Sequence, residues 1–384
     1  MPQKPQERDP LLTSLVRALC AVLALLSVCV TGYLLVRVAM TPRESAIVGR
    51  KIAKLPIGAQ IQQDLNNQLS NVLDGVANVE KVYWLRDDEQ APVPSPDHYG
   101  ETDDPSTLDW LLEKADETFG KQPMYFNTDI TILPGSSVRY YYDETLLVIN
   151  WKTVLDYAVY TFSEVRVAHP SQFRRFLSGG KYGENTLYLT SEMAKSVNAV
   201  MAASGDFYAN RHRGVIVSDG VVHLNTDGVP DICYVTRSGD LLLEHNRRFK
   251  DIAEAQEYVD KNDICFSMAF GPTLVHDGEL QKYFHRYPLG ETTGDYVRAA
   301  ICQMGSLHYL HAAVNAEKRH TAWPTMERFA KCIAATGCEQ AYALDGGQTA
   351  TVVVDNKVIN QVNYGSERKI SDIIYFATAL PQGG

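Results

Sequence analysis

The spacing of apolar and polar residues changes near residue 137, and the two parts of the chain predict different elements. Beyond this point, short apolar runs are separated by turn residues such as Asp143-Glu144 and Asp277-Gly278, a pattern typical of β-hairpins. Helical spacing is rarer there and predicts helices at residues 191–197, 252–259 and 324–335. The apolar runs predict strands at residues 138–142, 146–150, 214–217, 221–224, 264–270, 273–276, 297–302, 307–314, 349–354 and 373–379.

Before residue 137 the apolar spacing is helical. Apolar side chains recur every three or four residues within residues 41–80 and again within residues 106–120. Residues 86–106 are rich in Pro and Asp and predict a loop between these two segments. We therefore expect a stalk or linker with helices over residues 41–135.

The patterns after this stalk predict one domain at residues 136–381. Short strands predominate and the helices are few and scattered, so the expected class is α+β. Its sheet is expected to be mixed and mostly antiparallel, with flanking helices.

The longest apolar run, residues 18–36, contains no charge and is long enough to cross a hydrocarbon core of about 30 Å as a helix. We expect a tail at residues 1–17 and a transmembrane anchor at residues 18–40, which makes this a single-pass protein of the cell membrane. A cleaved signal peptide is the alternative. Basic residues lie on both sides of the run, so the charges alone leave the orientation open.

The charge along the chain is uneven. The 384 residues have a formal net charge of −10. Residues 1–54 contain eight basic and three acidic residues, a net of +5, which leaves −15 for residues 55–384. General nucleic-acid binding needs a basic surface, so the composition argues against that class and against nucleic acid as a partner.

Several common catalytic motifs are missing from the sequence. The chain contains no C-x-x-C pair, H-E-x-x-H, P-loop, G-x-S-x-G or G-x-G-x-x-G pattern. Cys332 and Cys338 flank the end of a predicted helix, where a disulfide and two free thiols are both compatible with the sequence.

Two aspartates follow directly on apolar, strand-like runs. Asp206 lies in Ser204-Gly205-Asp206-Phe207-Tyr208, between two aromatic residues and a strand of small residues. Asp345 precedes Gly346-Gly347, where backbone N–H groups can approach an anion. Carboxylates in such places can act as acids, bases or substrate anchors, although a plain turn explains either segment equally well.

Two arginines are candidate anion ligands. Arg298 lies inside the apolar run 297–302, where a guanidinium needs a partner. Arg368 precedes the last predicted strand. Arginine suits the two-pronged binding of a phosphate, while a partner on a neighbouring strand and a solvated surface position are the simpler explanations.

In combination and in this order, six segments resemble the phosphodiester glycosidase family. The resemblance covers roughly residues 160–381. The family includes bacterial proteins associated with exopolysaccharides. One segment departs from the family pattern, because the common Asn-Gly-Gly-Phe-Phe is SGDFY here. The segments are SGDFY at 204–208, GVIVSDGVV at 214–222, FGPTLVHDGE at 270–279, VRAAIC at 297–302, LDGGQTA at 344–350 and SERKISDIIYF at 366–376.

The resemblance implies hydrolysis of the bond between a sugar anomeric carbon and a phosphate oxygen, with a phosphate-linked carbohydrate as substrate. It also implies an extracytoplasmic domain that acts on envelope or exopolysaccharide glycans. The expected catalytic carboxylates are Asp206 and Asp345. The sequence does not distinguish which of them acts as the acid and which as the base. The expected substrate and phosphate ligands are Ser204, Gly205, Arg298, Gly346, Gly347 and Arg368.

The sequence is also compatible with a bound cation and with two other functions. No cofactor is required by the resemblance, and a divalent cation beside the carboxylates is compatible with it. The SGDFY departure favours, as the alternative function, a non-catalytic glycan-binding envelope protein with the same fold. A third alternative is an ordinary glycoside hydrolase of cell-wall glycan.

Overall fold

The computed structural model describes residues 85–380, except residues 87, 88, 128, 185, 283, 285–291 and 318–322. The described residues all lie in the second of two compact units of the chain, Lys81–Gly384. The predicted tail, anchor and helical segment 41–80 lie outside the described residues. Among the residues that are described, no helix is both long and apolar enough to cross a membrane.

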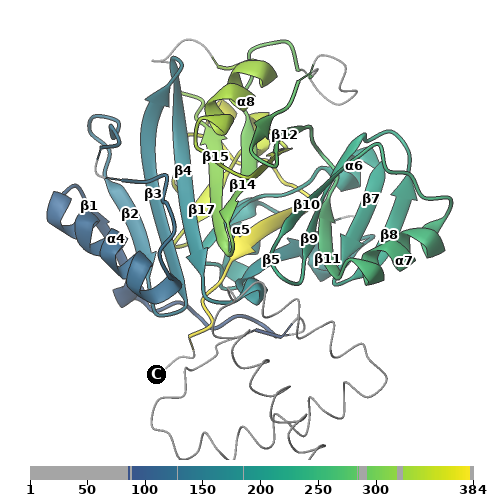
Figure 1. Cartoon of the computed structure of the whole chain (residues 1–384), viewed down its shortest axis with the longest axis horizontal. Helices are drawn as coiled ribbons and strands as arrows, with labels where there is room; N and C mark the ends of the chain where they lie inside the picture. Colours follow the sequence, from purple (N-terminus) through teal and green to yellow (C-terminus); the bar gives the residue numbers. More distant parts are fainter. Residues whose placement is uncertain are drawn as a thin grey trace, which may run out of the picture. The chain divides into compact units, whose positions relative to one another are not determined.

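One large antiparallel sheet dominates the described unit (Figure 1). Its order is β1-β2-β3-β4-β15-β14-β16-β12-β13, which confirms the predicted α+β class with a mostly antiparallel sheet. The strands are β1 (Tyr99–Thr102), β2 (Val138–Tyr142), β3 (Leu146–Leu155), β4 (Ala158–Val167), β12 (Thr273–His276), β13 (Glu279–Leu280), β14 (Ala299–Gly305), β15 (His308–Val314) and β16 (Gln340–Leu344).

This sheet begins before the boundary predicted at residue 136. β1 pairs with β2, and α4 (Pro105–Phe119) buries Leu111 and Ala115 in the same core. The helix predicted at residues 106–120 is thus confirmed. Its cap is Asp104, whose carboxylate accepts the Ser106 N–H at 3.0 Å. Residues 99–119 therefore belong to the sheet and its covering layer.

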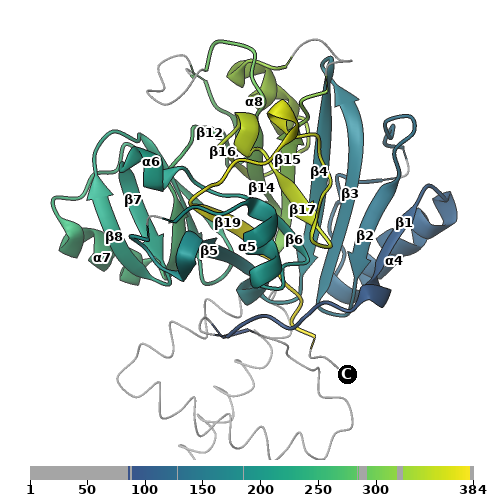
Figure 2. The same cartoon turned by 180° about the vertical axis from the view of Figure 1, so that it is seen from behind.

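A second sheet packs against one face of the first. Its order is β18-β17-β6-β19-β5. The ring of Tyr309 on β15 lies 4.8 Å from that of Phe173 on β5 and 5.4 Å from that of Phe376 on β19. Figure 2 shows α5 (Thr190–Ser196) over the outer side of this sheet. The strands are β5 (Phe173–Leu177), β6 (Met201–Ser204), β17 (Val352–Val354), β18 (Lys357–Val358) and β19 (Asp372–Phe376).

The opposite face of the large sheet is covered by α8 (Met326–Ala334). Phe329 of α8 stacks on Tyr160 of β4 at 6.1 Å. Since side chains alternate along a strand, Phe162 shares this face, while Thr161 and Ser163 face the second sheet. Both faces of β4 are buried.

The remaining strands form a smaller lobe to one side (Figure 1). A three-stranded sheet, β10-β9-β11, lies beside the hairpin β7-β8, which was predicted. The sequence did not predict β4, β5, β9 and β10, nor the short strands β1, β13 and β18, of which β1 lies within the segment predicted as a loop. The elements of the lobe are α6 (Tyr208–Arg211), β7 (Gly214–Ser218), β8 (Val221–Thr226), β9 (Asp231–Thr236), β10 (Leu241–His245), α7 (Ile252–Lys261) and β11 (Ile264–Met268).

Short 3-10 turns join several of these elements, and the five cysteines within the described residues are free thiols. Cys332 and Cys338 are both free, so the disulfide that the sequence allowed between them is not formed. The turns are Pro96–His98, Pro170–Gln172, Ser178–Gly180, Gly347–Thr349 and Asn363–Gly365.

Candidate active site

The SGDFY segment lies where β6 and β19 meet. Ser204 ends β6 and pairs with Ile373, and the Gly205 N–H donates to the Asp372 carbonyl at 3.1 Å. A Cβ atom on Gly205 would lie 2.5 Å from the Asp372 carboxylate. Only glycine therefore fits between Ser204 and Asp206 without displacing that carboxylate.

Asp206 is buried, with 2% of its surface exposed. Its Oδ1 accepts the Phe207 N–H and its Oδ2 accepts the Ala269 N–H, both at 2.6 Å. Its own N–H donates to Oδ1 of Asp372 at 2.9 Å. The carboxylate thus fastens the loop after β6 to the end of β11.

A buried ion pair that the sequence did not predict lies behind Asp206. Arg175 Nε lies 2.6 Å from Asp372 Oδ2, and its Nη2 lies 3.9 Å from Asp206 Oδ2. Its Nη1 donates to the carbonyls of Val217, at 3.2 Å, and Ser267. One guanidinium therefore joins two carboxylates to the smaller lobe.

The charge of Asp372 is set by opposing effects. Burial raises the pKa of its carboxyl to about 6, while the charge of Arg175 acts to lower it and that of Asp206 to raise it. The carboxyl is therefore mainly ionised at neutral pH and serves as the counter-ion of Arg175.

Asp345 follows the last residue of β16. Burial raises the pKa of its carboxyl to about 6. The Thr349 hydroxyl and the charges of Arg211 and Arg368 oppose this shift, and the charge of Asp206 adds to it. Its Oδ2 atom is buried and accepts no hydrogen bond within the described part of the chain. Asp345 is thus a carboxyl with one unused oxygen that lies within electrostatic reach of two cations and of Asp206.

The two cations meet at the ring of Phe207. The guanidinium carbon of Arg368 lies 5.1 Å from the ring centroid, and that of Arg211 lies 5.6 Å from it. Arg211 also lies over Phe270 at 4.4 Å and donates to the Ala269 carbonyl at 3.3 Å. Such contacts hold a guanidinium in place without neutralising its charge. Arg368 was among the residues predicted from the sequence, whereas Arg211 was not.

Arg298 makes different contacts. It donates to the carbonyls of Gly294, at 2.9 Å, and Pro324, at 3.4 Å, and lies 5.6 Å from the ring of Tyr296. Its side chain is 6% exposed. These contacts tie the segment before β14 to the segment before α8. Its predicted contact with phosphate stays a prediction.

The two glycines after Asp345 pack closely on the segment before β14. A Cβ atom on Gly346 would lie 2.4 Å from the Val297 carbonyl oxygen, and one on Gly347 would lie 2.8 Å from the Tyr296 hydroxyl. Gly347 also has a φ of +65°, which favours glycine. The pair therefore sets the path of the loop that carries Asp345.

The Ser204 hydroxyl is buried and has no hydrogen-bond partner among the described residues. Buried hydroxyls nearly always have a partner, so this group is a candidate to contact substrate or water.

As for metals, the described ranges contain no group of three or more His, Cys, Asp and Glu side chains suited to hold an ion.

Buried carboxyls that interact with arginines, as Asp206, Asp372 and Asp345 do, suit the cleavage of a bond between a sugar and an anionic group. The family model described as phosphodiester glycosidase matches residues 197–377. This match confirms the resemblance to the phosphodiester glycosidase family, a family of hydrolases. The matched segment contains Asp206, Asp345, Asp372 and both cations at Phe207, whereas Arg175 lies outside it.

Two solved structures are similar to part of this chain. The catalytic domain of zebrafish N-acetylglucosamine-1-phosphodiester alpha-N-acetylglucosaminidase is 15% identical, with a TM-score of 0.49, over 66% of this chain and 85% of that one. A hypothetical protein from Synechocystis is 11% identical, with a TM-score of 0.49, over 67% of this chain and 69% of that one. No curated protein sequence matches the chain.

Proposed function

We propose that the protein hydrolyses the glycosidic bond of sugar 1-phosphodiesters in envelope or exopolysaccharide glycans. The observation that carries this proposal is the state of Asp345. Its carboxyl has a pKa of about 6 and an unused buried oxygen, and the nearby charges of Arg211 and Arg368 lower that pKa. These properties support a role for Asp345 as the reactive carboxylate and for the two arginines as phosphate ligands.

The two arginines would bind the phosphate. Arg368 is exposed and Arg211 is half-buried, and their charges both act on Asp345. Negative charge grows on the phosphate oxygen as the C1–O bond breaks, so cations held nearby stabilise the transition state more than the ground state.

Asp345 would act in its ionised form. Phosphate is a good leaving group, so its departure needs little protonation, and the demanding task is to supply electrons to C1. As a base, the carboxylate would take a proton from a water whose oxygen forms the new C1–OH bond, while the C1–O bond to phosphate breaks and the phosphate leaves with the electron pair. As a nucleophile, it would displace the phosphate by forming its own bond to C1, and a water would then break that bond and form the C1–OH bond.

Asp206 would position the site. Both of its carboxylate oxygens already accept hydrogen bonds from backbone N–H groups, so it fixes the loop around Phe207. The guanidinium groups of Arg211 and Arg368 both contact the Phe207 ring. Arg175 and Asp372 fix Asp206 in turn. In this proposal Ser204 contacts the sugar, and Gly205, Gly346 and Gly347 shape the loops.

We further propose that residues 18–40 anchor the protein in the cell membrane and that the catalytic domain is extracytoplasmic. Support comes from the uncharged run at residues 18–36 and from the envelope substrates proposed above. Accessibility of an engineered cysteine at the exposed Tyr364 to a membrane-impermeant thiol reagent on intact cells tests this orientation.

One observation favours the second candidate, a non-catalytic glycan-binding protein. The Asp206 of SGDFY, which replaces the common second glycine, is engaged in backbone hydrogen bonds on both oxygens. The distinguishing experiment incubates the full chain in detergent with an aryl phosphodiester of N-acetylglucosamine, an aryl glycoside without phosphate, and sugar 1-phosphates. Release of sugar from the phosphodiester supports the proposal. Release from the plain glycoside alone supports an ordinary glycoside hydrolase, and binding without turnover supports the second candidate.

A further inference from the structure

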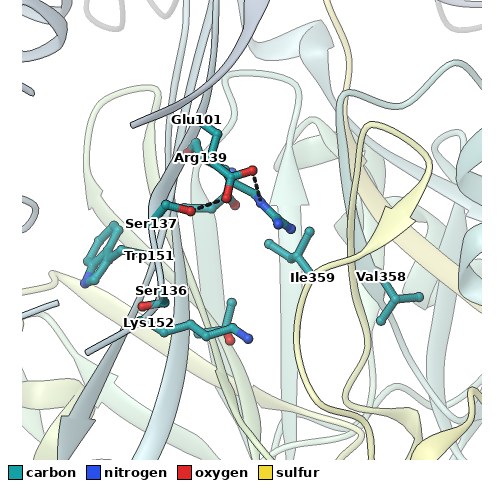
Figure 3. A pocket seen from close by; sticks show the side chains of 11 residues that line it. Glu101, Ser136, Ser137, Arg139, Trp151, Lys152, Val358 and Ile359 are labelled. Carbon is teal, nitrogen blue, oxygen red and sulfur yellow. Dashed lines mark hydrogen bonds and ion pairs between the residues drawn. The ribbon is translucent and has the colours of Figure 1, made fainter. Parts of the chain in front are cut away.

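A polar cavity of about 350 Å³ lies in a different part of the unit (Figure 3). It lies between four strands at one end of the large sheet and the segment at the end of β18. None of its lining residues belongs to the candidate active site. They are Glu101, Gly135, Ser136, Ser137, Arg139, Asn150, Trp151, Lys152, Thr161, Val358 and Ile359.

Strand register gathers polar side chains on this wall. Glu101 on β1 pairs with Arg139 on β2, which pairs with Asn150 on β3. One step along, Lys152 pairs with Thr161 on β4. Since Asn150 and Lys152 are two residues apart, their side chains share one face of the sheet. Figure 3 shows Arg139 and Lys152 extending toward Val358 and Ile359, with Trp151 directed away.

The cavity carries one uncompensated positive charge. Arg139 is paired with Glu101, at 3.1 Å between Nε and Oε2, and Ser137 also donates to that carboxylate. Lys152 is half-buried, and its ammonium makes no hydrogen bond or ion pair with any described residue. The wall therefore offers a free cation beside a neutralised pair, which suits an anionic group.

An unused acceptor lies beside this cation. Asn150 is 2% exposed, and its Oδ1 is buried and accepts no hydrogen bond within the described ranges. Its Nδ2 donates weakly to the Arg139 carbonyl at 3.4 Å. A buried acceptor without a donor is costly and uncommon. Since Asn150 lines the cavity, the natural donor is a hydroxyl group of an occupant.

The same register row continues into the protein with further unpaired atoms. Asn150 pairs with Ser163, which pairs with His311 on β15. The Ser163 hydroxyl and both ring nitrogens of His311 are buried and have no partner in the described part. Burial lowers the pKa of His311 to about 3, so this ring is neutral. Ser163 and His311 do not line the cavity, so their unpaired atoms fit internal water.

We propose that this cavity is a second binding site, which takes one anionic sugar unit. Lys152 binds its carboxylate or phosphate group, and Asn150 Oδ1 accepts one of its hydroxyl groups. The volume lies at the small end of the range of about 300–1,000 Å³ for ligand sites, which suits a single sugar unit. This site goes beyond the proposed hydrolysis, because it binds whether or not the protein is a hydrolase.

Isothermal titration of the full chain in detergent tests the proposal. The probes are glucuronic acid, glucose 6-phosphate, neutral glucose and inorganic phosphate. We expect an anionic sugar to bind, and glucose and inorganic phosphate to bind at least about tenfold more weakly. The two anionic probes show whether a carboxylate or a phosphate is preferred.

Three variants locate the binding. Lys152→Met is expected to weaken the binding about tenfold or more, because a charge-assisted hydrogen bond is lost. Lys261→Met removes an exposed lysine from α7 and is expected to have no effect. Arg368→Ala removes an arginine of the candidate active site, so binding that persists in it and is weakened by Lys152→Met belongs to the cavity, even if the protein proves inactive.

Other outcomes would overturn the proposal. They are the absence of binding by both anionic sugars at millimolar concentration, equal binding of inorganic phosphate, and binding that is unchanged by Lys152→Met. Thermal denaturation checks that the variants fold. If Lys152→Met does not fold, Lys152→Gln replaces it, with the same expected loss.

Discussion

Replacing Arg175 by methionine is expected to destabilise the protein strongly. Arg175→Met keeps much of the side-chain volume but leaves Asp372 and Asp206 without their shared cation. Breaking a buried ion pair from one side costs about 3–5 kcal/mol. The carbonyls of Val217 and Ser267 also lose a donor, and an unpaired buried acceptor costs about 1–3 kcal/mol. Because these costs overlap, we expect a loss of at least about 4 kcal/mol.

Urea denaturation of the full chain in detergent, followed by circular dichroism, measures this loss. The loss is expected to be smaller at pH 5 than at pH 8, because protonation of Asp372 removes the unpaired charge. In the double variant Arg175→Met, Asp372→Asn, the loss should be about 1–3 kcal/mol smaller than the sum of the two single losses.

Arg174→Met is a matched control on the same strand. Arg174 is half-buried and donates to the Arg86 carbonyl at 3.0 Å, and it does not pair with Asp206 or Asp372, so its removal should cost about 2 kcal/mol or less. If Arg175→Met lies within about 1 kcal/mol of the wild type, the two carboxylates do not depend on this arginine. The account of how the site is held together would then be refuted.

Three further predictions concern the candidate active site. If Asp345 acts as a carboxylate, kcat/KM rises with pH and levels off above about 6, whereas a decline above this pH would make it the acid. Arg368→Ala and Arg211→Met should each lower kcat/KM about 10–100-fold for a phosphodiester, and an unchanged value would remove that arginine from phosphate binding. Gly346→Ala places a Cβ atom 2.4 Å from the Val297 carbonyl, so thermal denaturation should show a loss of about 1–3 kcal/mol, while a wild-type melting curve would contradict the close packing.

The sequence predicted elements well where turn residues or periodic apolar runs separated them. The strand at 138–142 and the hairpin at 214–224 are examples. β4 was missed because both of its faces are buried and its alternation of apolar and polar residues changes phase between Ser163 and Glu164. Its Glu164 and Arg166 look exposed in the sequence, but Glu164 accepts the N–H groups of Tyr125 and Phe126. The sequence around Glu164 contains no pattern that predicts partners so far away along the chain.

The candidate site was predictable only in part, because some of its contacts join residues that are far apart in the sequence. Asp345 follows a strand and precedes two glycines, a signal visible in the sequence, and the charges of Arg368 and Asp206 both affect the pKa of its carboxyl. Arg175 and Asp372 lie within or beside apolar runs. A charged residue in such a place needs a buried partner, and this signal could have identified both residues from the sequence. Arg211 lies in the polar segment after SGDFY, and its contact with Phe270 depends on the tertiary fold.

The most direct test of the central claim is the release of sugar from an aryl phosphodiester of N-acetylglucosamine by the wild type and by Asp345→Asn. This substitution keeps the shape of the side chain and removes its charge. We predict measurable turnover by the wild type and a loss of about 100-fold or more in the variant. No turnover by the wild type on any sugar phosphodiester, or undiminished turnover by Asp345→Asn, would contradict the account.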